Sequence, residues 1–145
     1  MLRSYGRAAQ PWVAWLFVAC VVVQVFLAGL GVFDSPTSFV THREFGYLFG
    51  WLVFVLLALA IAGRMGRRII GASALLIVLF ILQSVFVAFR TTQPAVAALH
   101  PVNGFLIGLV GIVLAREGRR LAAAARGPRA TPLATDAPEP AKARA

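Results

Sequence analysis

The chain has 145 residues, of which 60% are hydrophobic and only 13% are charged. Soluble globular domains carry about 25% charged residues, so this composition excludes an ordinary soluble domain and predicts a membrane protein. The formal net charge of +9 does not indicate a nucleic-acid partner, because the basic residues concentrate in alternate connections between apolar runs. We expect this basic surface to meet the anionic headgroups of the inner leaflet instead.

Four apolar runs are long enough to cross a bilayer as helices, which takes about 20 residues. In chain order they cover residues 12–32, 42–62, 69–89 and 96–115. Pro11 suits the first turn of the first helix, and charged residues or turn formers separate the runs. Lipid offers no hydrogen-bond partner to backbone N–H and C=O groups, so we expect each apolar run to be a helix, which bonds these groups internally. The lone cysteine, Cys20, cannot form an internal disulfide and is expected to be a small residue facing lipid or core.

The basic residues alternate between rich and poor segments along the chain. The rich segments carry Arg3 and Arg7, then Arg64, Arg67 and Arg68, then Arg116, Arg119, Arg120, Arg126, Arg129, Lys142 and Arg144. The other two connections hold only Arg43 and Arg90, so the positive-inside rule places both ends in the cytoplasm of a bacterial cell, with the helices in the inner membrane. Short connections make neighbours antiparallel, and the predicted fold is an all-α four-helix bundle.

The predicted domain organisation has three parts. Residues 1–11 form a cytoplasmic N-terminus, residues 12–116 form the transmembrane bundle, and residues 117–145 form a basic, then Pro- and Ala-rich tail. From residue 127 onward the tail has one large apolar residue, Leu133, and cannot bury enough surface to order itself. We expect this tail to be disordered and cytoplasmic.

The chain contains two similar halves at a period of 58 residues. Each half has a glutamine, then a histidine followed by two glycines at four-residue intervals. These residues are Gln24, His42, Gly46 and Gly50 in the first half, and Gln83, His100, Gly104 and Gly108 in the second. Glutamine and histidine are 18 residues apart in one half and 17 in the other. The shared order predicts a duplicated helix hairpin.

This repeat predicts that the two histidines meet. With both ends inside, the second and fourth helices begin at the outer face, where His42 opens one and His100 lies about a turn into the other. These helices are diagonal in a four-helix ring, so two imidazoles at one depth can ligate one iron from opposite sides. Histidine is a common axial ligand of haem. The sequence therefore predicts a haem site, with His42 and His100 as metal ligands.

The neighbouring residues have two interpretations each. The glycines lie on one helix stripe and leave room for a flat macrocycle, but glycines four apart also serve helix packing. Arg43 and Arg90 can pair with haem propionates or act as ordinary interfacial arginines. Gln24 and Gln83 lie in apolar spans, where a polar group needs a partner. They either bond between helices, or contact the ligand and orient a histidine.

These residues make the chain resemble one four-helix half of the heme A synthase family. The resemblance covers roughly residues 12–116 and is carried by Gln24, His42-Arg43, Gln83 and His100. Small uncharacterised bacterial four-helix membrane proteins are also similar, some of them with a stretch like Leu-His-Pro-x-Asn-Gly at residues 99–104. The resemblance implies four helices and b-type haem binding.

The same resemblance does not imply haem oxidation. The family's synthase has a catalytic glutamate three residues before the helix-two histidine of one half, where this chain has Phe39, and Glu44 lies on the other side of His42. The family also uses two bundles and this chain supplies one, which a homodimer could rebuild. No zinc spacing, Walker motif or dinucleotide fingerprint occurs in the sequence, so classical enzyme chemistry is not expected.

Three functions follow from the sequence. The first is a small membrane haem-binding protein in electron transfer or haem handling, partnered by itself or by a respiratory or haem-handling membrane complex. The second is a non-catalytic structural or assembly subunit of a larger membrane complex, indicated by many small residues and no catalytic group. The third is a small transporter or quinone-binding protein, indicated by the internal repeat.

Overall fold

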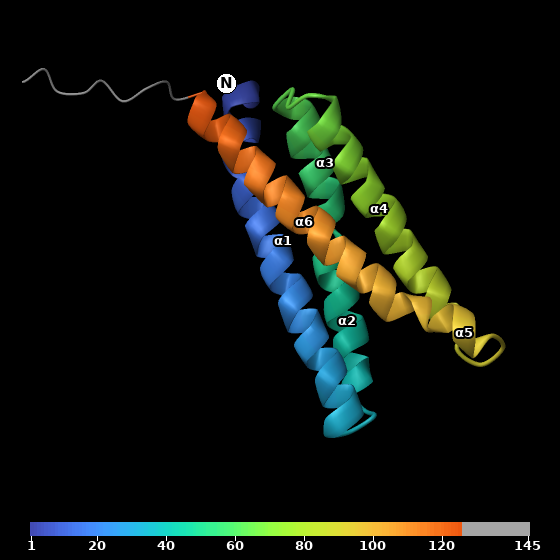
Figure 1. The fold of residues 1–145 in the computed structure, drawn as a ribbon. Helices are drawn as coiled ribbons and strands as arrows, with labels where there is room; N and C mark the ends of the chain where they lie inside the picture. The colour runs from blue at the N-terminus through green and yellow to red at the C-terminus, as the bar shows by residue number, and fades with distance from the viewer. Residues whose placement is uncertain (126–145) are drawn as a thin grey trace, which may run out of the picture.

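The computed structural model describes residues 1–125, and the regular structure of this part is entirely helical (Figure 1). The helices are α1 (Leu2–Phe33), α2 (Ser38–Gly50), α3 (Leu52–Ala62), α4 (Arg67–Ala88), α5 (Pro94–Ala97) and α6 (Leu99–Ala124). They make four segments that are long and apolar enough to span a membrane, because α2 continues into α3 and α5 into α6. The predicted all-helical fold with four apolar helical segments is confirmed.

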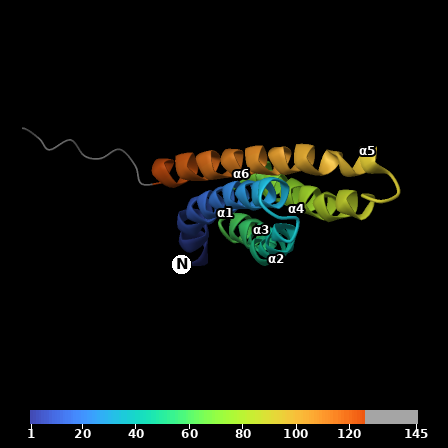
Figure 2. The same cartoon turned by 90° about the horizontal axis from the view of Figure 1, so that it is seen from below.

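The four segments form a ring. α1 packs against α2 and α3 on one side and against α6 on the other, and α4 packs against α3 and α6. Seen from below, α6 lies on one side of the bundle and the α2–α3 segment on the opposite side, with α1 and α4 between them (Figure 2). The segments that carry the two histidines are therefore diagonal, as expected from chain order.

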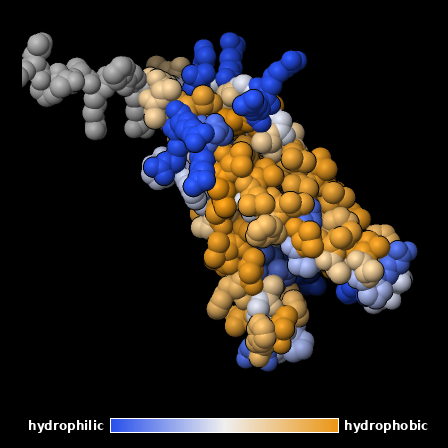
Figure 3. Space-filling view, in the orientation of Figure 1, coloured by the Kyte–Doolittle hydropathy of each residue, from blue (hydrophilic) through white to orange (hydrophobic). Residues whose placement is uncertain are grey.

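The bundle is closed at one end and divided at the other. At the closed end, the first turns of α1 meet the α3–α4 connection, and the last turns of α6 lie close by (Figure 1). At the open end, the α1–α2 hairpin and the α4–α5–α6 hairpin diverge as two prongs. Figure 3 shows a hydrophobic surface along the bundle, hydrophilic residues gathered at the closed end, and more of them in the notch between the prongs.

Glycine sets how closely the helices approach at the closed end. A Cβ atom on Gly6 of α1 would lie 2.7 Å from the backbone nitrogen of Gly63 and 2.9 Å from the backbone oxygen of Leu59. The Arg7 side chain donates to the Gly63 carbonyl at 2.9 Å, which ties α1 to the end of α3. Small residues allow such backbone contact between membrane helices, and this crossing brings the buried side chains of Phe17 and Leu56 into one core.

The first and last helices are longer than the apolar pattern predicts. α1 begins at Leu2 instead of residue 12, so Pro11 lies inside the helix and not in its first turn. Proline removes one backbone hydrogen bond from the helix, but the contacts of Gly6 and Arg7 with Gly63 hold the preceding turns of α1 in place. α6 continues to Ala124 because alanine and arginine favour helix. The disordered tail predicted from residue 127 onward lies outside the described residues.

We predict that Gly6→Ala destabilises the protein by about 1–3 kcal/mol, because the new methyl group meets backbone that cannot move aside. Gly71→Ala on α4 is the matched control, since a Cβ there has nothing within 4 Å. Alanine in an exposed helix position should stabilise by up to about 1 kcal/mol. Thermal unfolding in detergent, followed by circular dichroism, measures both variants. Equal melting temperatures for the two would contradict the close crossing.

Candidate functional site

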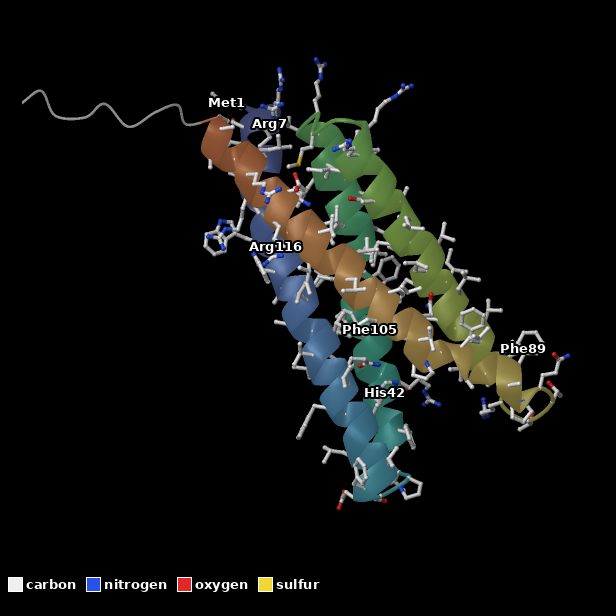
Figure 4. All side chains as sticks on the ribbon, in the orientation of Figure 1. Met1, Arg7, His42, Phe89, Phe105 and Arg116 are labelled. Carbon is white, nitrogen blue, oxygen red and sulfur yellow. The ribbon has the colours of Figure 1, made fainter. Side chains whose placement is uncertain are left out.

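Two imidazoles meet across the diagonal of the bundle. His42 of α2 and His100 of α6 are each half-buried, and their ring centroids lie 6.2 Å apart with 59° between the ring planes. Figure 4 shows His42 near the place where the two prongs separate. α2 begins at Ser38, so His42 does not open its helix as the sequence analysis expected. It lies about one turn inside α2, whereas His100 is the second residue of α6, directly after the short helix α5.

Each ring is held by the backbone of a glutamine on the other helix of its own hairpin. The carbonyl oxygen of Gln24 on α1 lies 3.0 Å from Nδ1 of His42. The carbonyl oxygen of Gln83 on α4 lies 2.9 Å from Nδ1 of His100. The same contact in both halves agrees with the duplicated hairpin read from the sequence. The two bonded residues are 18 positions apart in the first half and 17 in the second.

These two contacts determine the tautomer of both imidazole rings. A backbone carbonyl can only accept a hydrogen bond, so Nδ1 must carry the proton in each neutral imidazole. The lone pair is then on Nε2 in both rings. Ligating histidines in metalloproteins commonly have this arrangement, in which the non-ligating N–H donates to a carbonyl and orients the ring.

The glutamine side chains differ between the halves. The amide of Gln24 donates from Nε2 to the backbone oxygen of His42 at 2.8 Å. The amide nitrogen of Gln83 lies 3.2 Å from Nε2 of His100, and its oxygen accepts from Asn103 at 2.6 Å. Gln24 and Gln83 thus bond between helices and contact a histidine at the same time, which combines the two roles that the sequence left open.

The predicted glycine stripes make room for side chains. A Cβ on Gly46 would lie 2.8 Å from the Gln24 amide nitrogen, and one on Gly104 would lie 3.2 Å from that of Gln83. One turn further on, Gly50 faces the Phe80 ring and Gly108 faces Val21. The first glycine of each stripe therefore admits the glutamine that holds the histidine, and the second serves ordinary helix packing.

The two arginines lie on the surface. Arg43 pairs with its neighbour Glu44 at 2.8 Å, and both side chains are exposed. Arg90, also exposed, makes no side-chain hydrogen bond or ion pair with residues 1–125. Asn103 is the residue that sequence reasoning missed: it is 4% exposed and also donates to the carbonyl of Leu79 at 2.8 Å. Its signal was a polar side chain in an apolar span, three residues after His100.

The separation of the two rings can be compared with that of two histidines bound to one metal ion. An imidazole nitrogen binds a metal at about 2.0 Å, so two rings on opposite sides of one metal have centroids roughly 6 Å apart, close to the observed 6.2 Å. Within residues 1–125, no group of three or more His, Cys, Asp or Glu side chains could hold a bare metal ion.

Residues 24–92 match the model of a family of unknown function, DUF6220. The match covers slightly less than half of the chain. It includes Gln24, His42 and Gln83, and it stops before His100 and Asn103. No curated protein and no solved structure has a significant match to the chain.

We predict that Asn103→Leu destabilises the protein by roughly 1–2 kcal/mol. An interhelical hydrogen bond in a membrane protein contributes about 0.6 kcal/mol on average and at most about 1.7, and this change removes two of them, to Leu79 and Gln83. Ser73→Ala is the control, because the Ser73 hydroxyl is buried without a partner in the described residues. Its removal should cost nothing. The comparison is made from the thermal unfolding midpoints of the two variants in detergent. An unfolding midpoint of Asn103→Leu equal to that of wild type would show that the hydrogen bonds of Asn103 contribute no stability.

Proposed function

We propose that the protein is a small integral membrane haem-binding protein, in which His42 and His100 hold one b-type haem between the two hairpins. The observation that carries the proposal is the pair of imidazoles 6.2 Å apart, each with Nδ1 against a glutamine carbonyl. This leaves two Nε2 lone pairs as candidate ligands from opposite sides of the bundle. The resemblance of Gln24, His42, Gln83 and His100 to one half of the heme A synthase family supports the same cofactor.

The donor set fits haem better than a bare metal ion. Structural metal sites in proteins use about four protein ligands and catalytic ones about three, whereas a haem iron already has four equatorial nitrogens and needs only axial ligands. Two histidines, which form no cluster with a third His, Cys, Asp or Glu side chain within residues 1–125, meet that need. Bound haem would supply one-electron chemistry, and the surrounding residues would orient the ligands and limit the access of water.

Each residue then has a definite task. His42 and His100 are the ligands, and the backbone carbonyls of Gln24 and Gln83 fix the plane of each ring. Gly46 and Gly104 admit the two glutamine side chains. Arg43 and Arg90 lie on the exposed surface, where a propionate would have to draw Arg43 away from Glu44. The proposed role is electron transfer or haem handling. Haem oxidation is not proposed, because Phe39 stands where the heme A synthase family has its catalytic glutamate.

Charge supports an orientation for the site. The closed end carries Arg3, Arg7, Arg64, Arg67 and Arg68, and the open end carries Arg43 beside Glu44 and Arg90. By the positive-inside rule, the closed end would face the cytoplasm of a bacterial inner membrane. The histidines would then lie toward the extracytoplasmic face.

The cofactor is tested by the absorption spectrum of the full chain purified with haem b present. The expected result is a red protein with a sharp α band on reduction, and loss of that band in His42→Ala and in His100→Ala. Phe105→Ala is the control, because Phe105 is on α6 near His100 but is 70% exposed, and it should keep the band. A wild-type preparation that stays colourless rules out the haem site.

The orientation is tested by labelling single cysteines in a Cys20→Ser background. Ser35→Cys and Thr92→Cys, in the two connections at the open end, should react with a membrane-impermeant thiol reagent in intact cells. Arg64→Cys, in the connection at the closed end, should react only after the membrane is broken. The reverse labelling pattern would show the opposite orientation in the membrane, with the histidines toward the cytoplasm.

A further inference from the structure

The two halves of the bundle differ at one position next to the histidines. Asn103 lies three residues after His100, and the residue at the same place after His42 is Phe45. Asn103 is buried and bonds to the Leu79 carbonyl and the Gln83 side chain. Phe45 packs against Phe49 instead, with ring centroids 5.4 Å apart. The Gln24 amide oxygen, which has no such asparagine beside it, is buried without a partner in the described residues.

The hydrogen bonds around His100 can be assigned from two backbone carbonyls. The Leu79 carbonyl must accept, so the Asn103 atom beside it is the NH₂ group, and the Gln83 atom that faces this NH₂ is the amide oxygen. The other end of the Gln83 amide is therefore the NH₂ group. The Gln83 carbonyl likewise requires a proton on Nδ1 of His100. Gln83 then donates to the Nε2 lone pair of His100 at 3.2 Å.

His42 has no such neighbour on its second nitrogen. The Gln24 amide donates to the backbone oxygen of His42 and not to the ring. No hydrogen bond to Nε2 of His42 occurs within residues 1–125. The lone pair that would ligate a metal is thus free on one histidine and engaged on the other.

We propose that Gln83, held in place by Asn103, is a cap on the ligating nitrogen of His100, so that the two histidines are unequal ligands. This inference rests on the proposed function. His42 is the ligand that is ready to bind, and His100 is the exchangeable one, because its nitrogen ligates only after the Gln83 amide has moved away. Gln83 is a positioning residue in this account and does not itself bind the metal.

The size of the effect follows from the hydrogen bond that is broken. A net contribution of about 0.5–1.5 kcal/mol corresponds to roughly three- to tenfold in an equilibrium constant. The cap therefore weakens coordination by His100 by about that factor. A small neutral ligand for ferrous haem, such as carbon monoxide, would displace His100 in preference to His42.

The first test uses the haem-free full chain, which has only two histidines. Labelling them with ¹⁵N gives two sets of ring signals, and both should show a proton on Nδ1. Gln83→Leu should shift the Nε2 signal of His100 toward that of an unbonded nitrogen and leave His42 unchanged. Gln24→Leu is the matched control and should move neither Nε2 signal comparably, since Leu keeps the backbone carbonyl in both variants. Gln83→Met, which also lacks the amide, repeats the test if Leu disturbs the packing.

The second test uses the same proteins loaded with haem b and reduced. Carbon monoxide affinity should fall about three- to tenfold in Gln83→Leu, because uncapped His100 competes better. It should fall less in Gln24→Leu, because the Gln24 amide bonds to the backbone of His42 and not to either ring. An equal effect of both variants, or an unmoved His100 signal, overturns the cap. If no variant takes up haem while the His100 signal still shifts, the proposed function fails and the cap is supported, so the two failures are distinguishable.

Discussion

The bond from an imidazole Nδ1 to a glutamine carbonyl is the interaction on which the rest of this site depends. It occurs once in each hairpin, between α1 and α2 at His42 and between α4 and α6 at His100. A side chain that bonds to the backbone of the neighbouring helix fixes the relative height of the two helices as well as its own direction. Because both hairpins use the same bond at the same depth, the two rings arrive at one level. The lone pairs remain on the nitrogens that are not used for this purpose.

The packing of the bundle is tight on one side of the two histidines and divided on the other. Close backbone contact at Gly6 and Gly63 fixes the closed end. The buried rings of Phe17 and Phe49 and the partly buried ring of Phe80 fill the middle, with centroids between 5.5 and 6.5 Å apart. Beyond these rings the hairpins diverge, and His42 lies where the divergence begins (Figure 4). The ring of His100 lies 6.2 Å from that of His42. Small residues and aromatic packing thus hold the helices together on one side of the site, while the other side stays wide.

Much of this architecture could be predicted from the sequence because a bilayer imposes simple rules. Four apolar runs, short connections and the repeated order of Gln24, His42, Gln83 and His100 were enough to give the helices, their ring order and the meeting of the histidines. The helix ends were not predictable in the same way. Hydropathy marks where a chain can lie in lipid, whereas α1 and α6 extend beyond it because of local helix propensity and of contacts made across the bundle, such as Arg7 with Gly63.

The details of the site also lay beyond the sequence pattern. That Gly46 and Gly104 admit glutamine side chains, and that Asn103 engages one of them, depends on side-chain directions between helices distant in the chain. The proposed function depends on one haem iron being shared by the Nε2 atoms of His42 and His100. Low-temperature electron paramagnetic resonance of the full chain loaded with ferric haem b tests this most directly. Two imidazole ligands should give a low-spin signal, and a purely high-spin signal in the wild-type protein would contradict coordination by both histidines.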